Sequence, residues 1–131
     1  MNQSRFLDKM EVVKLDIKSR QGLPLYRVMN TARYYSESLD KVFTIPKGFV
    51  TDFATIPKLL QWLFPSGGEY KWECVLHDVF YDVTSVDITR EEADNVFKGA
   101  MEASGIGWWK VWCLYNAVRV FGEGYFSERK L

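Results

Sequence analysis

The sequence predicts a small α+β domain, in which a short antiparallel β-sheet of three or four strands is followed by three helices. In the first 50 residues, short β-prone runs alternate with turn residues. From residue 71 onwards, the apolar residues follow helical spacing. A chain of 131 residues fits one domain around one core. We therefore divide the single domain, 1–131, into a β-rich part (1–50), a loop (51–70) and a helical part (71–122).

Three runs in the β-rich part are predicted to form the strands. They are rich in β-branched and aromatic residues and are separated by Gly, Pro, Asp and Ser; they cover residues 11–19, 25–38 and 42–48. The loop that follows begins irregularly, between Gly48 and Pro57. Residues 58–64 then favour a short helix, and the PSGGE sequence at 65–69 is interpreted as a turn rather than a mobile lid.

The first two helices of the helical part are predicted from apolar residues spaced three and four positions apart. Their stripes are Trp72, Val75, Leu76, Val79 and Phe80 in the first, and Ala93, Val96, Phe97, Ala100 and Met101 in the second. The second helix begins after Thr89, which can form a capping box with Glu92, and it ends at Gly105 and Gly107. Both stripes are expected to face the core.

A third helix is predicted in WWKVWCLYNAVRVF, residues 108–121, which is apolar on almost every side. Because such helices are usually buried, we expect it at the centre of the helical layer. Trp108, Trp109 and Trp112 suit either the core or a lipid interface, and the helical spacing favours the core.

Charge and composition narrow the classes of function. Lys plus Arg and Asp plus Glu both number 17, so the formal net charge is zero and we expect no nucleic-acid partner. The first residues lack the pattern of a signal peptide, and no apolar run has the length of a transmembrane segment. The two cysteines, Cys74 and Cys113, are too few for a disulfide framework and are expected to be free, buried thiols.

The candidate site lies in CVLHDVFYD, residues 74–82, which contains the single histidine of the chain. Polar or reactive residues form a second stripe on this helix, namely Cys74, His77, Asp78 and Tyr81. The helix therefore has an apolar face and a chemical face. His77 and Asp78 form either a working site or an ordinary hydrogen-bonded pair.

Asp94 bears on that choice because it lies at the edge of the apolar stripe of the second helix. If the two helices pack antiparallel, Asp94 can accept a hydrogen bond from one ring nitrogen of His77, and the other nitrogen can take a proton from water. This arrangement predicts a histidine general base oriented by a carboxylate. The alternative for Asp94 is an acidic residue favoured near a helix start by the helix dipole.

The C-terminal half resembles prokaryotic phospholipase A2 enzymes in three ordered motifs, CVLHDVFYD, EEADNVFKGAM and YNAVRVFG. The resemblance implies a three-helix layer like that of phospholipase A2. It also implies that His77 activates a water, that Asp94 orients His77, and that Asp78 binds a calcium ion that polarises the ester carbonyl. Cys74 matches a cysteine of that family, but the chain lacks its usual disulfide partner, and Phe80 stands where many secreted members have another cysteine.

A second acidic residue, Asp52, is a candidate ligand for the same calcium ion. Calcium takes about six to eight oxygen ligands, so Asp78, Asp52, loop carbonyls and water are expected to form the shell. Tyr81 is expected to support the oxyanion or the metal. Asp52 equally suits an Asx turn. The chain departs from the enzyme family here, because that family has a recognisable glycine-rich or cysteine-tied calcium loop.

Most of the chain is similar to the domain of unknown function 1353 family. The similarity lies in four ordered motifs, IPKGFVTDFATIPKLLQWLFP, LHDVFY, ADNVFKGAM and AVRVFG. The family is found largely in bacteriophages and prophages, which implies a location in the host cytoplasm or in the virion. It implies no established activity.

Two classes of function follow as hypotheses. The leading one is a calcium-dependent hydrolase of carboxylic esters, with phospholipid or another ester as substrate and His77 as the general base. The alternative is a non-enzymatic phage protein, structural or directed at a host protein, that retains the helical scaffold. Binding to a virion protein or inhibition of a host enzyme through the aromatic surface belongs to this second class.

Overall fold

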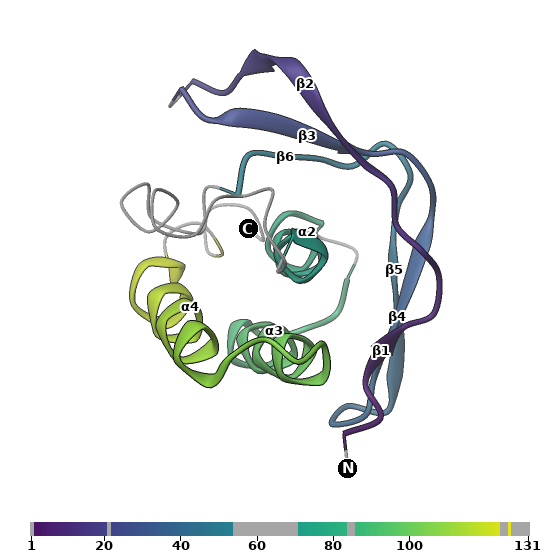
Figure 1. Cartoon of the computed structure of the whole chain (residues 1–131), viewed down its shortest axis with the longest axis vertical. Helices are drawn as coiled ribbons and strands as arrows, with labels where there is room; N and C mark the ends of the chain where they lie inside the picture. The colour runs from purple at the N-terminus through teal and green to yellow at the C-terminus, as the bar shows by residue number, and fades with distance from the viewer. Residues whose placement is uncertain (1, 21, 54–70, 84–85, 124–125, 127–131) are drawn as a thin grey trace.

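The computed structural model describes residues 2–20, 22–53, 71–83, 86–123 and 126 (Figure 1). Six short strands come first: β1 (Arg5–Phe6), β2 (Val12–Lys18), β3 (Pro24–Val28), β4 (Ala32–Ser36), β5 (Lys41–Ile45) and β6 (Val50–Thr51). The described helices follow: α2 (Lys71–Asp82), α3 (Arg90–Ala103) and α4 (Trp108–Phe121). The predicted α+β class is confirmed, while the predicted helix at 58–64 and turn at 65–69 lie outside the described residues.

The strands are divided between two antiparallel sheets, with strand orders β1-β4-β5 and β2-β3-β6. The predicted run at 25–38 is therefore two strands, because the chain passes from one sheet to the other at Asn30. The Asn30 side chain accepts a hydrogen bond from Glu11 N at 2.8 Å and donates one to Lys9 O at 2.8 Å. Such side-chain bonds to backbone compete with a continuous strand and hold the corner.

Alternate strand residues form an apolar wall that faces the helices. The buried residues of β3, β4 and β5 are Tyr26, Val28, Ala32, Tyr34, Ser36, Phe43 and Ile45. Their spacing of two places them on one face of each strand. Tyr34 and Phe43 are direct partners across β4 and β5.

Helix α2 lies at the centre of the fold, and the two sheets curve around it (Figure 1). Phe80 contacts Phe43 of β5 with ring centroids 4.8 Å apart, and Trp72 contacts Phe6 of β1 at 5.3 Å. The predicted stripe is buried, since Val75, Leu76, Val79 and Phe80 are at most 1% exposed. The chemical face of α2 is buried as well, because α3 packs against His77 and Tyr81 and the end of β6 packs against Asp78.

Helix α3 packs against α2 on one side and α4 on the other. The predicted capping box is present: Thr89 Oγ1 accepts from Glu92 N at 3.1 Å, and Glu92 Oε1 accepts from Thr89 N at 3.0 Å. All five residues of the predicted stripe are buried. The start and the inner face of this helix are thus as the sequence predicts.

Helix α4 lies at the outer edge of the helical layer, so the expectation that it forms the centre is wrong (Figure 1). Its buried residues are Val111, Leu114, Ala117 and Val118. Trp108, Trp109 and Trp112 are 80%, 47% and 63% exposed, so the core interpretation of these tryptophans is also wrong. The physical reason is that α4 packs against α3 with one side, while its opposite side is equally apolar but exposed. Among the described helices, none is both long and apolar enough to cross a membrane.

Candidate functional site

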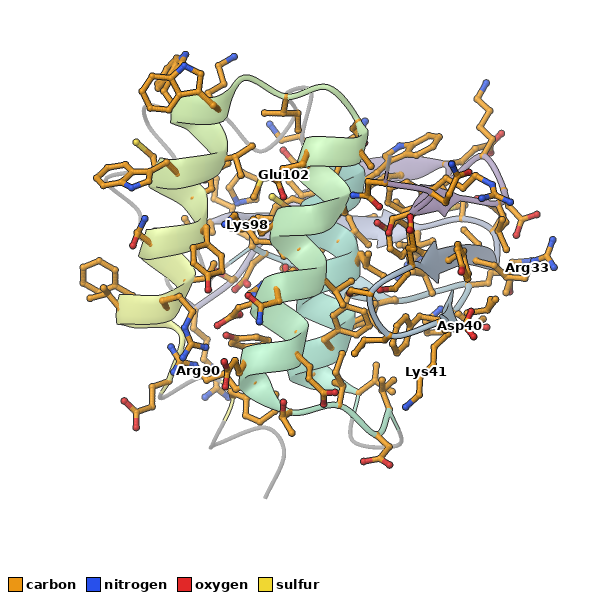
Figure 2. The ribbon with its side chains drawn as sticks, turned by 90° about the horizontal axis from the view of Figure 1, so that it is seen from below. Arg33, Asp40, Lys41, Arg90, Lys98 and Glu102 are labelled. Carbon is orange, nitrogen blue, oxygen red and sulfur yellow. The ribbon has the colours of Figure 1, made fainter. Side chains whose placement is uncertain are left out.

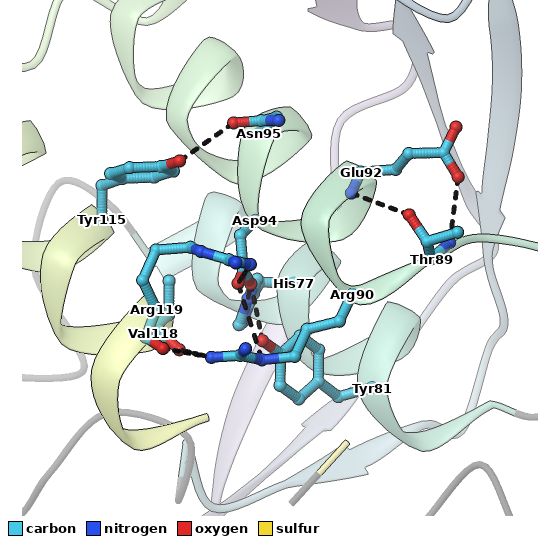
Figure 3. Close-up of polar contacts among 10 residues, drawn as sticks. All are labelled: His77, Tyr81, Thr89, Arg90, Glu92, Asp94, Asn95, Tyr115, Val118 and Arg119. Atoms are coloured by element: carbon cyan, nitrogen blue, oxygen red, sulfur yellow. Dashed lines mark hydrogen bonds and ion pairs between the residues drawn. The ribbon is translucent and has the colours of Figure 1, made fainter. Parts of the chain in front are cut away.

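The structure brings together the histidine and the aspartate that the sequence pairs. His77 Nε2 of α2 lies 2.7 Å from Asp94 Oδ1 of α3 (Figure 3). His77 is 1% exposed and Asp94 is fully buried. Packing of α2 against α3 creates this contact, because the chemical face of α2 lies against the buried edge of α3.

The Asp94 carboxylate accepts hydrogen bonds from three side chains. Besides His77, the Tyr81 hydroxyl donates to Oδ1 at 2.6 Å, and Arg119 Nη1 donates to Oδ2 at 2.8 Å. Arg90 Nε lies 3.9 Å from Oδ2. A buried carboxylate is costly unless it is paired and hydrogen-bonded, and this one is both.

These partners keep Asp94 ionised and thereby determine which nitrogen of His77 carries a proton. Burial alone raises the pKa of Asp94, but the hydrogen bonds from His77, Tyr81 and Arg119, with the charge of His77, outweigh burial and lower that pKa. An ionised carboxylate can only accept hydrogen bonds. His77 Nε2 is therefore the donor, and in the neutral ring Nδ1 holds the lone pair that a general base needs.

Two aromatic rings hold the imidazole of His77 in place. Its centroid is 4.3 Å from the Tyr81 ring and 4.7 Å from the Phe97 ring. Burial and the hydrogen bond to Asp94 raise the pKa of Tyr81, so its hydroxyl stays a donor at neutral pH. Tyr81, which the sequence interpretation places at the oxyanion or metal, is directed at Asp94.

Two arginines complete the network, and the sequence interpretation did not include them. Arg90 Nη2 donates to Val118 O at 3.0 Å and also to Arg119 O, so the start of α3 is tied to the end of α4. Arg119 reaches from α4 to Asp94. The sequence did contain a signal for Arg119, because Arg119 and Lys110 are the only charged residues of a largely apolar helix.

The other aspartate of the chemical face, Asp78, faces the β-sheet residues. Its Oδ2 accepts a hydrogen bond from the Thr51 hydroxyl at the end of β6, and Thr51 Oγ1 accepts one from Phe53 N at 3.1 Å. Asp78 is 2% exposed. Thr51, the neighbour of Asp52 in the chain, is thus held against α2 beside Asp78.

The side chains on α2 and after β6 can be compared with the ligands that a calcium ion requires. Asp78 and the half-buried Asp52 supply carboxylate oxygens, which are the ligands that calcium takes. The described part of the chain contains no group of three or more His, Cys, Asp or Glu residues that could hold a metal, and the predicted shell combines these two carboxylates with loop carbonyls and water. The kind of ligand fits, and the calcium site stays a prediction.

The cysteines are free thiols, as predicted, but only Cys74 is also buried as predicted. Cys74 is buried one turn before His77, and Cys113 is half-buried in α4. Burial raises the pKa of the Cys74 thiol well above its usual value, and the charges of Asp78 and Glu73 add to this effect. Cys74 is therefore an inert part of the core rather than a nucleophile.

Comparison with known families identifies the chain. A family model described as "Protein of unknown function (DUF1353)" matches residues 26–118, from β3 through most of α4. The chain belongs to this family. The matched region of this DUF1353 protein includes His77, Asp78 and Asp94. No curated protein and no solved structure matches the chain.

Proposed function

We propose that this DUF1353 protein is a phage-associated hydrolase of carboxylic esters, with phospholipids as its substrate class. The observation that carries the proposal is the 2.7 Å contact between His77 Nε2 and the ionised Asp94, which leaves Nδ1 as the basic nitrogen. This is the arrangement of a general base and an orienting carboxylate.

The chemistry proceeds through His77 and water. His77 Nδ1 takes a proton from a water molecule as the water oxygen attacks the ester carbonyl, and the tetrahedral intermediate then expels the alcohol, which receives that proton from the imidazolium. Asp94 stabilises the imidazolium, while Tyr81 and Arg119 hold Asp94 in place. Because His77 is 1% exposed, each turnover requires the ester and one water to reach Nδ1 inside the fold.

Two resemblances support the substrate class and the source. The order of the helical motifs is similar to that of prokaryotic phospholipase A2, and the family resemblance favours a phage or prophage origin. A calcium ion held by Asp78 and Asp52 would polarise the ester carbonyl. The steps assigned to His77, Asp94, Tyr81 and Arg119 do not depend on that ion.

Substitution of His77 tests the proposal. Fatty acid release from mixed phospholipid vesicles is measured with and without calcium for the wild type, His77→Ala and the control Asn116→Ala, an exposed change on α4. Loss of a general base is expected to lower the rate by about a hundred- to ten-thousand-fold, with the control unchanged. Full activity of His77→Ala would contradict the assigned role, and a wild type that releases no acid from vesicles or short-chain esters would contradict hydrolysis.

A second candidate function is a non-enzymatic phage protein that binds a virion or host protein. The complete burial of the His77 and Asp94 pair suits a structural network, and the exposed tryptophans of α4 suit a binding surface. This function predicts a stoichiometric partner and no turnover. Affinity purification from infected cells that recovers no partner would count against it.

A further inference from the structure

A groove of about 390 Å³ lies between α3 and α4, on the outside of the helical layer. Its walls include three aromatic side chains, Trp108, Trp112 and Tyr115, all from α4. Two charged side chains, Lys98 and Glu102, line it from α3. The groove therefore combines aromatic faces with one positive and one negative group.

The two charges lie one behind the other along the α3 side of the groove. Lys98 and Glu102 are one turn apart on α3, which is about 6 Å along a helix axis (Figure 2). Lys98 Nζ lies 5.1 Å from the centre of the Tyr115 ring, which marks the basic end. The chain turns back after α3 at residues 104–107, so Trp108 at the start of α4 is on the side of Glu102.

The acidic end has the features of a site for an organic cation. Trp108 is 80% exposed and Trp112 is 63% exposed, one turn further along α4. Indole faces attract cations, and quaternary ammonium groups are bound in aromatic cages. Among the described residues, Glu102 has no ion-pair partner, so its carboxylate is free to complement a bound cation.

We propose that this groove binds the zwitterionic phosphocholine headgroup of a phospholipid. The trimethylammonium group lies against Trp108, Trp112 and Glu102, and the phosphate is directed towards the Lys98 ammonium. This charge order matches a ligand with a cation and an anion a few ångströms apart, whereas a simple cation leaves Lys98 uncompensated.

The groove is distinct from the proposed hydrolytic site, which touches α4 through Arg119 near the opposite end of the helix. Its purpose, docking the protein on a substrate surface, rests on the proposed function. Headgroup binding itself does not require hydrolysis. The two proposals can therefore fail separately.

Binding of soluble ligands is the first test. The indole N–H signals of the five tryptophans are followed by NMR while phosphocholine, choline or inorganic phosphate is added. Phosphocholine is expected to bind most tightly. Glu102→Gln or Trp112→Ala should lower the affinity for phosphocholine by about threefold to thirtyfold. Lys98→Gln should weaken the binding of phosphocholine and leave the binding of choline unchanged. The controls Glu91→Gln and Trp109→Ala change the same residue types outside the groove lining and should bind normally.

Vesicle binding in the His77→Ala background separates this inference from the proposed function. Sedimentation with phosphatidylcholine vesicles should exceed that with phosphatidylglycerol vesicles, and Glu102→Gln and Trp112→Ala should reduce it. Groove-dependent binding without hydrolysis by the wild type would overturn the proposed function alone, and hydrolysis without groove-dependent binding would overturn this inference alone. The inference would also be overturned if choline and phosphocholine bound equally well and Lys98→Gln had no effect on either. It would likewise be overturned if a trimethyl-lysine peptide bound as tightly as phosphocholine.

Discussion

Asp94→Asn is expected to destabilise the fold by about 3 kcal/mol, because a buried carboxylate loses its charge while its donors stay in place. The carboxylate accepts two hydrogen bonds on Oδ1 and one on Oδ2. An amide offers one acceptor oxygen, so at least one donor loses its partner, at about 1–3 kcal/mol. Arg119 also loses its counter-charge, but its side chain is 32% exposed, which keeps the total near the lower end of the range for broken buried ion pairs, about 3–5 kcal/mol.

The loss should depend on pH in a defined direction. The pKa of Asp94 is lowered in the folded protein from an ordinary value of 3.8, so the folded state favours the ionised carboxylate. Its contribution to stability is fully present above pH 3.8 and is lost as the pH falls through the folded pKa. The difference between wild type and Asp94→Asn should therefore shrink as the pH falls below 3.8 and acid protonates Asp94 in the wild type.

Urea unfolding at a series of pH values measures both effects. The matched control is Asp8→Asn, the same chemical change at a partly exposed aspartate that is also paired with an arginine, Arg33. Because exposed pairs contribute little, the control should change the free energy of unfolding much less than Asp94→Asn. A loss below about 1 kcal/mol for Asp94→Asn, or one that grows in acid, would refute the account of Asp94 as an ionised, fully partnered carboxylate.

Two further predictions concern Asp78 and Cys74. Calorimetric titration should show calcium binding to the wild type and to the exposed control Asp87→Asn, but not to Asp78→Asn; no binding to the wild type would make the calcium prediction wrong. Cys74 should resist alkylation in the folded protein, because it is buried and its pKa is raised, and should react once urea unfolds the chain. Mass spectrometry after brief labelling checks this, and rapid native labelling at Cys74 would contradict it.

The sequence predicted most where local and tertiary preferences agree, as in α3. Its Thr89 cap, its buried stripe and its end before Gly105 all follow from short-range patterns that the packing does not override. The contact between His77 and Asp94 was also predictable, because the short connection between two amphipathic helices restricts how they can pack. In both cases the information lies within about 20 residues of chain.

The position of α4 was less predictable for a physical reason. A helix that is apolar on nearly every side does not indicate which side a neighbour covers, and here only one side is covered. The division of the strands between two sheets was likewise not predictable from the local sequence. It depends on the long-range hydrogen bonds of the Asn30 side chain to Lys9 and Glu11, and not on the β propensity of residues 25–38.

The burial of α2 on all sides changes how its chemical face is interpreted. Polar side chains on a buried helix need hydrogen-bond partners whatever their function. Stability alone therefore requires that His77 donates a hydrogen bond and that Asp78 accepts one. Partners for Nε2 therefore do not by themselves indicate catalysis. Nδ1 is the discriminating atom, since a structural histidine gains by having both nitrogens bonded, whereas a general base needs one lone pair available.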